Sequence, residues 1–190
     1  IAALVFLIII SNGANEPGKI LAGTIYGSSL ILLYGASTLY HSFQSPKLKY
    51  YLKIFDHSAI YVLIAGSYTP FTLYVIKGFW GEMMLIAIWI IAITGVIFKL
   101  FFVNKFKYFS TALYLLMGWL ALLAIQPLFQ NLPFGGLFLL IAGGLCYSVG
   151  VIFFLWEKLP FSHAIWHLFV LGGSVCHFFA ILLYVLPEKC

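Results

Sequence analysis

The chain has 190 residues, of which 64% are hydrophobic and only 8% are charged. Soluble domains carry about 25% charged and 45–50% apolar residues, so this composition excludes a soluble protein and indicates a chain that crosses a membrane several times. The net charge is +5 and every basic residue is a lysine. Because the lysines gather between apolar segments, we expect them to meet anionic lipid headgroups rather than nucleic acid.

Seven apolar segments follow one another with short polar connections, which predicts an all-α membrane protein, a seven-transmembrane helix bundle forming a single domain over residues 1–190. The approximate spans are 1–11, 19–41, 56–76, 82–103, 109–129, 134–156 and 163–186. The first is about half of the roughly 20 residues that a spanning helix needs, so we expect it to be truncated at its start. The longest predicted loop is Ser42–Phe55, which contains Pro46 and three lysines. Three cysteines without CxxC spacing are expected to be small apolar side chains: Cys146, Cys176 and Cys190.

The lysines are divided unequally between the two ends of this predicted bundle. One end carries Lys47, Lys49, Lys53, Lys99, Lys105, Lys107 and Lys158, and the other carries Lys19, Lys77 and Lys189. The positive-inside rule makes the lysine-rich end cytoplasmic. The N-terminus is then cytoplasmic and the C-terminus outside, which is the reverse of a G-protein-coupled receptor.

This topology brings four ionisable residues to one membrane depth. His41 ends the second span, Asp56 begins the third, and His163 and His167 begin the seventh, all at the lysine-rich end. His163 and His167 are four residues apart and share a helix face, with about 5–6 Å between their Cβ atoms. Ionisable groups are costly in membranes and usually functional, so their convergence favours a site over packing alone.

Three imidazoles with an open position are a known catalytic zinc set, although another metal that prefers imidazole would satisfy the same spacing. We therefore predict that His41, His163 and His167 bind zinc. Asp56 is the candidate to hold or deprotonate a water there. Ser37 lies four residues before His41 on the same face, where its hydroxyl can hydrogen-bond that water or a carbonyl oxygen, or simply pack between helices.

Other polar residues are weaker candidates. His57 follows Asp56 directly, so its side chain is expected to point away from the metal. It is expected to contact the residues around the metal ligands or a lipid headgroup rather than to bind the metal. His177 is ten residues past His167, about 15 Å along the helix, so it can line a cavity but not join the site. Tyr61, Tyr68 and Tyr114 are candidates for hydrogen bonds to a lipid headgroup. The last span contains no lysine for a retinal Schiff base, and two histidines on one helix face cannot both be axial ligands of one haem.

Three spaced motifs resemble the hemolysin III proteins, the bacterial branch of the progestin and adipoQ receptor family that includes the adiponectin receptors. They are Ser37-x-x-x-His41, Asp56-His-Ser-Ala-Ile-Tyr with Gly66-Ser-Tyr-Thr-Pro-Phe, and His163-x-x-x-His167 with His177-Phe-Phe. The resemblance covers essentially the whole chain. It implies a multi-pass protein of the bacterial plasma (inner) membrane with its N-terminus inside, and zinc on His41, His163 and His167. It also implies Asp56 hydrogen-bonded to the zinc water, with Ser37 close by. The wider superfamily includes alkaline ceramidases, which hydrolyse lipid amides.

Three functions remain open at this point. The first is a zinc-dependent hydrolase of lipid amide or ester bonds, with a membrane lipid as its substrate. The second is a non-catalytic regulator or receptor of membrane state, in which zinc is structural and a lipid is at most a ligand. The third is the cytolysis that the family name suggests, which suits poorly a chain that resembles a resident membrane protein. The oligomeric state does not follow from the sequence.

Overall fold

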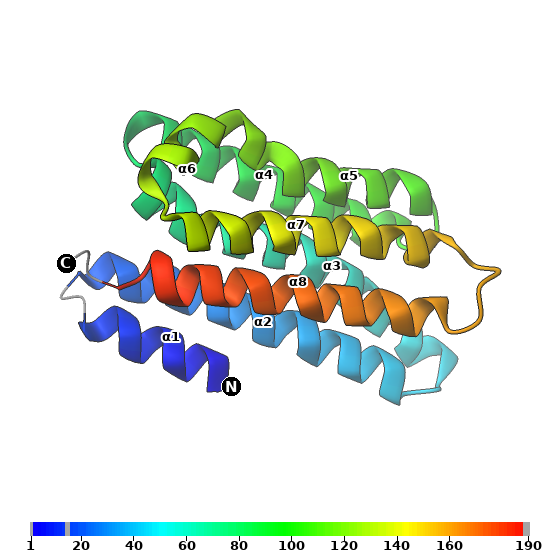
Figure 1. Ribbon diagram of the computed structural model, residues 1–190. Coiled ribbons are helices and arrows are strands. Elements are labelled where there is room, and N and C mark those ends of the chain that lie inside the picture. Colours follow the sequence, from blue (N-terminus) through cyan, green and yellow to red (C-terminus); the bar gives the residue numbers. More distant parts are fainter. Residues whose placement is uncertain (1, 14–15, 188–190) are drawn as a thin grey trace.

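The computed structural model describes residues 2–13 and 16–187, and these residues form helices with no strand among them. The elements in order are α1 (Ala2–Gly13), α2 (Pro17–Ser42), α3 (Pro46–Phe71), the π-helical turn η1 (Thr72–Ile76), α4 (Gly78–Phe102), α5 (Lys107–Trp119), the 3-10 segment η2 (Leu120–Ala124), α6 (Ile125–Asn131), α7 (Phe134–Leu155) and α8 (Ser162–Tyr184). The long helices run alongside one another in one bundle (Figure 1).

Six stretches of the described residues are long and apolar enough to cross a membrane. They are 17–42, 46–76, 78–102, 107–131, 134–155 and 162–184. The short apolar helix α1 packs beside α2 and covers only part of its length (Figure 1). The predicted positions Ile1, Lys189 and Cys190 lie outside the described residues, whereas Cys146 and Cys176 are free thiols in α7 and α8.

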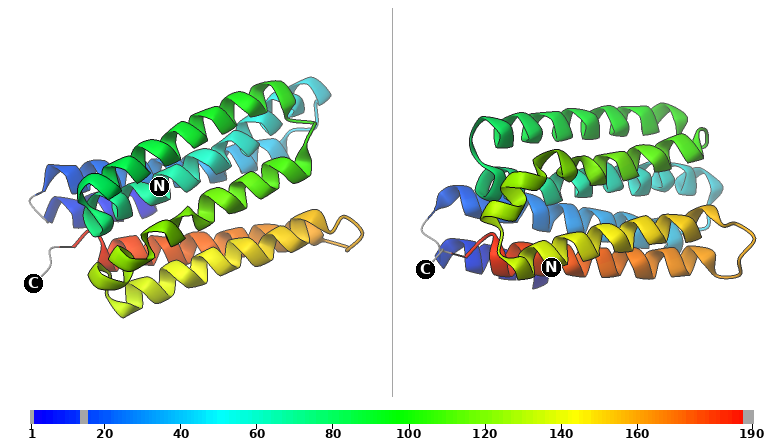
Figure 2. Two further views of the ribbon diagram at one scale, coloured as in Figure 1. Left: turned by 90° about the horizontal axis from the view of Figure 1, so that it is seen from above. Right: turned by 45° about the horizontal axis from the view of Figure 1, so that its top comes forward.

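Helix α3 is the central element of the bundle. In its most apolar stretch 72% of the residues are buried, against 17–44% in the other five candidate spans. It packs against α2, α4, α5 and α8, while α5 lies between α4 and α7 (Figure 2). The outer helices instead turn large apolar side chains outward, an arrangement that is favourable in lipid and costly in water.

The predicted loop Ser42–Phe55 is wrong over most of its length. Only residues 43–45 separate α2 from α3, because α3 begins at Pro46. Proline is well suited to the first helical turn, and lysine is a good helix former outside an apolar environment. Asp56 therefore lies ten residues inside α3 rather than at its start.

The predicted span 109–129 is broken in the middle. Pro127 lacks an amide hydrogen and its ring crowds the carbonyl four residues earlier, and the preceding residues adopt the tighter 3-10 form of η2. The Tyr68 hydroxyl of α3 lies 2.8 Å from the carbonyl oxygens of Met117 and Gly118, and it accepts a hydrogen bond from the Ala121 amide at 2.8 Å. Tyr68 thus pairs backbone groups that the break would leave unsatisfied inside the bundle.

The connections that carry most of the lysines lie together at one end of this bundle. The α2–α3, α4–α5 and α7–α8 connections all lie there, at the right of Figure 1. Helix α8 begins at the same end of the bundle at which α2 ends, so His41 lies opposite the first turns of α8.

Candidate metal centre

Two of the three histidines come from the first turns of α8. The chain enters this helix through Phe161, whose φ of 58° is left-handed, and the helix begins at Ser162. His163 and His167 are one turn apart, and their Nε2 atoms are 3.1 Å from each other. The i,i+4 spacing in the sequence is therefore realised on one face of α8.

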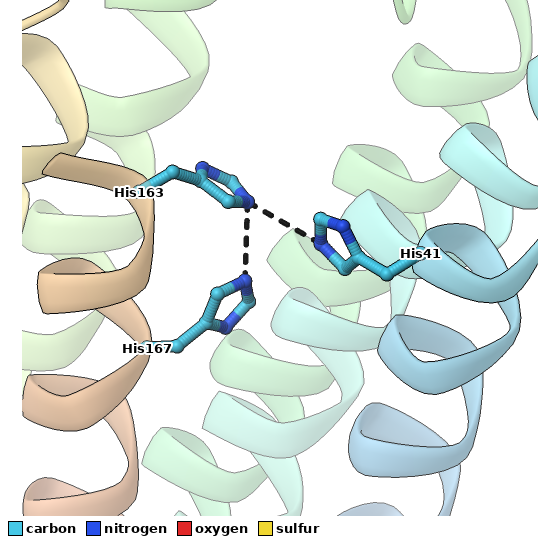
Figure 3. A group of neighbouring side chains, drawn as sticks. All are labelled: His41, His163 and His167. Atoms are coloured by element: carbon cyan, nitrogen blue, oxygen red, sulfur yellow. Dashed lines mark hydrogen bonds between the residues drawn. The ribbon is translucent and has the colours of Figure 1, made fainter. Parts of the chain in front are cut away.

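The third histidine comes from the last turn of α2. The Nε2 atom of His41 lies 3.3 Å from Nε2 of His163, and its ring centre is 5.3 Å from that of His167. Figure 3 shows the three rings projecting from α2 and α8 into the space between these helices, with their Nε2 atoms directed toward one another. All three candidate ligand atoms lie within 4.8 Å of one another.

The histidine nitrogens cannot satisfy one another by hydrogen bonding alone. A neutral imidazole nitrogen offers either one N–H or one lone pair, yet Nε2 of His163 faces two other Nε2 atoms. Three converging nitrogens, each in the tautomer that presents a lone pair, would instead suit a cation. Two nitrogens bound to tetrahedral zinc at about 2.0–2.1 Å are about 3.3–3.4 Å apart, which is close to the 3.1 and 3.3 Å found here.

Asp56 and Ser37 are placed beside each other near this cluster. The Asp56 carboxyl on α3 is half-buried, and it interacts with the Ser37 hydroxyl of α2. Ser37 is one turn before His41 on α2, as its spacing predicts. The structure thus brings these two candidates together, while metal binding and catalysis stay predictions.

An elongated cavity of about 500 Å³ begins at this end of the bundle. Its walls include Ser37, Asp56, His163 and His167. At the far end they include the apolar side chains of Phe71, Ile76, Leu128 and Leu137. Asp56 and Phe71 are 15 residues apart on α3, so the cavity extends about 22 Å along the bundle axis. It is deep and mostly apolar, with polar groups concentrated at one end.

The other histidines have the separate positions that the sequence predicts. His177 lines the cavity, with Nε2 3.2 Å from the carbonyl oxygen of Leu140 and its ring against Tyr147. His57 lines it too, and its ring interacts electrostatically with three lysines as well as with His163.

Two of the three candidate tyrosines already form hydrogen bonds within the protein. Tyr68 is bonded to the broken helix described above, and the Tyr114 hydroxyl donates to the carbonyl oxygen of His57 at 2.9 Å. The Tyr61 hydroxyl is buried and interacts with the hydroxyls of Tyr114 and Ser110 without a well-formed hydrogen bond. Their predicted role as headgroup donors is therefore not supported for Tyr68 and Tyr114.

The sequence reading missed a buried lysine. From the sequence, Lys99 is grouped with the lysines expected to meet lipid headgroups, but it lies in the last turn of α4 with a side chain only 1% exposed and faces the cavity. Its position four residues after Gly95, within an apolar run, is the signal that it belongs to the interior. Near it, Lys107 pairs with Glu157 at 2.6 Å and holds the pKa of that carboxyl below its ordinary value.

A membrane-embedded helical bundle with a three-histidine cluster at one end is therefore the class of protein that the geometry defines. A family model described as "Haemolysin-III related" matches residues 1–178. The chain belongs to this family, whose members include relatives of the adiponectin receptors.

Curated relatives agree with this assignment. The chain is similar to "Hemolysin-3" of Bacillus cereus, with 56% identity over 187 residues, 98% of this chain and 85% of the relative. It is similar to "Hemolysin-3 homolog" of Bacillus subtilis, with 52% identity over 184 residues, 97% of this chain and 86% of the relative. It is also similar to the human "Monocyte to macrophage differentiation factor", with 34% identity over 167 residues, 85% of this chain and 69% of the relative. No solved structure matches the chain.

Proposed function

We propose that this chain is a zinc-dependent hydrolase that cleaves amide or ester bonds of membrane lipids. The observation that carries the proposal is the three-histidine cluster, of which His163 and His167 line, together with Asp56, a deep and mostly apolar cavity. We further propose a seven-helix bundle in the bacterial inner membrane, with the lysine-rich end cytoplasmic.

His41, His163 and His167 are the residues that would hold the metal. Among the described residues the cluster contains three ligands and no fourth, which fits the open set of a catalytic site better than a closed structural one. When bound in such a set, zinc acts as a Lewis acid and makes water nucleophilic near neutral pH.

The surrounding residues have separate roles in this proposal. Asp56 accepts a proton from the attacking water and returns it to the leaving amine or alcohol. Ser37, in contact with the Asp56 carboxyl, holds that group in position. The apolar walls receive the acyl chain and keep bulk water from the reacting carbonyl, which strengthens the polar interactions at the cavity end.

A second candidate is a non-catalytic membrane regulator with a structural metal, and the name Hemolysin-3 carried by the relatives is consistent with a cytolytic role. The hydrolase and the regulator predict different rates of lipid hydrolysis. A structural metal predicts a zinc-containing protein that hydrolyses no lipid, whereas the open three-ligand set favours the hydrolase.

The proposal is tested with purified, zinc-loaded protein in mixed micelles containing ceramide or a lysophospholipid as the amide or ester substrate. Asp56→Asn keeps the side-chain shape but removes the proton acceptor, so zinc content should stay the same and turnover should fall about 100-fold or more. Glu82→Gln, an exposed carboxylate at the opposite end of the bundle, is the matched control and should keep full turnover. Equal turnover in wild type and Asp56→Asn would remove Asp56 from the mechanism, and no turnover on either substrate would favour the regulator.

A further inference from the structure

The cavity has a second polar cluster, formed by α3, α4 and α5. At its centre is Lys99, whose ammonium lies 6.0 Å from the ring centre of Tyr114. Among the described residues no carboxylate lies within ion-pair distance of it. A buried ammonium is costly unless an anion or several acceptors compensate it. Lys99 therefore has no counter-charge among the described residues.

The groups around Lys99 add positive charge rather than neutralise it. Lys53 donates to Oδ1 of Asn104 at 2.8 Å, and Lys107 is paired with Glu157. His57 interacts with the charges of Lys53, Lys99 and Lys107 together. Asp56 interacts with Ser37 on the other side of α3, so Glu157 is the one carboxylate paired with this group of lysines in the described chain. Low-dielectric walls focus such a field into the cavity.

A buried hydroxyl beside this cluster also lacks a well-formed hydrogen bond. Ser110, in the first turn of α5, is 1% exposed and lines the cavity, and its hydroxyl interacts with the buried Tyr61 hydroxyl without a well-formed hydrogen bond. Buried hydroxyls are normally paired, so one that faces a cavity without a well-formed hydrogen bond can still donate to an acceptor there. One oxyanion would compensate Lys99 and accept from Ser110.

We propose that Lys99 and Ser110, together with Lys53, bind the oxyanion headgroup of a single-chain amphiphile, a carboxylate or a phosphate, whose acyl chain lies in the apolar part of the same cavity. The cavity continues from Lys99 past Tyr114 to Leu128, so headgroup and chain find their surroundings in one space. The site does not use the histidine cluster and stands independently of the hydrolase proposal.

The test is equilibrium binding to the purified full chain in a neutral detergent, with radiolabelled oleate and 1-oleoyl-lysophosphatidate as probes. Uncharged 1-oleoylglycerol, which has the same chain, controls for the headgroup, and inorganic phosphate controls for the chain. Both anions, or one of them, should bind saturably and at least about 10-fold more tightly than 1-oleoylglycerol, because hydrogen bonds to charged groups are strong. Binding of only one anion identifies the source of the headgroup.

Lys99→Met should reduce anion affinity about 10-fold or more, while Lys99→Arg keeps most of it. Lys105→Met, an exposed lysine in the turn between α4 and α5, is the matched control and should bind like wild type. His167→Ala should also bind like wild type, which separates this site from the metal centre.

The proposal is overturned if Lys99→Met binds both anions normally, or if inorganic phosphate binds as tightly as lysophosphatidate. If Lys99→Met does not fold, Lys53→Met and Ser110→Ala replace it, and unchanged affinity in both would overturn the proposal.

Discussion

Removing His167 is the most direct perturbation of the proposed metal centre. Its Nε2 atom is 3.1 Å from that of His163, so His167→Ala leaves two ligands where three converge. Groups that only orient a metal ligand change affinity by roughly 10- to 100-fold, and loss of a ligand itself should exceed about 100-fold. We expect about one zinc per chain in wild type and less than a tenth of that in the variant, by elemental analysis.

The same change has a predictable effect on stability. Metal present at about 100 times its Kd stabilises the folded chain by about 2.7 kcal/mol, which for a chain of this length raises the unfolding temperature by about 5–10 °C. A chelator should lower the unfolding temperature of wild type by this amount and leave His167→Ala unchanged. Thermal unfolding in detergent, with and without chelator, measures the difference.

His177→Ala is the matched control, because His177 is on the same helix but about 15 Å away. It should keep its zinc and its response to the chelator. Two results would refute the reasoning: folded wild-type protein without zinc, or equal zinc loss in His167→Ala and His177→Ala.

Two further pairs of variants test the packing around the cavity by unfolding in detergent. Tyr68→Phe should lower the free energy of unfolding by about 1–3 kcal/mol, because it unpairs the Ala121 amide, whereas Tyr61→Phe removes a hydroxyl without a well-formed hydrogen bond and should leave stability unchanged or raised. Gly95→Ala should cost about 1–3 kcal/mol, because its Cβ would strike the Tyr61 ring. Gly35→Ala has open space and should gain up to about 1 kcal/mol. Equal effects within either pair would contradict the packing described here.

The histidine cluster could be anticipated because its geometry depends on few quantities. The i,i+4 spacing of His163 and His167 fixes their relative position, and the alternation of spans decides which helix ends lie together. The sequence could not supply the orientation of the His41 ring or the contact between Asp56 and Ser37. Those depend on how α2, α3 and α8 are rotated about their axes, which side-chain packing across the whole bundle determines.

The errors have a common physical origin in the use of hydropathy. Hydropathy detects the part of a helix that suits lipid, so it placed the start of the third span ten residues after Pro46, where α3 begins. It also grouped Lys99 with the exposed lysines of the bundle end, although the side chain turns inward from the last turn of α4. A helix that extends beyond the apolar layer, and a charged side chain buried inside that layer, require knowledge of neighbouring helices.

The consecutive residues Asp56 and His57 connect the two polar clusters of the cavity. Successive side chains on a helix are about 100° apart, so α3 directs Asp56 toward Ser37 on α2 and His57 toward the lysines of α4 and α5. Helix α3 therefore has a site suited to a cation on one side and a site suited to an anion on another. If the sites are independent, the changes in unfolding temperature caused by zinc and by oleate should add in wild type, and His167→Ala and Lys99→Met should each remove one of them. A lipid that spans both sites would instead make the two effects non-additive, and that result would place its headgroup and its reacting carbonyl within one bound molecule.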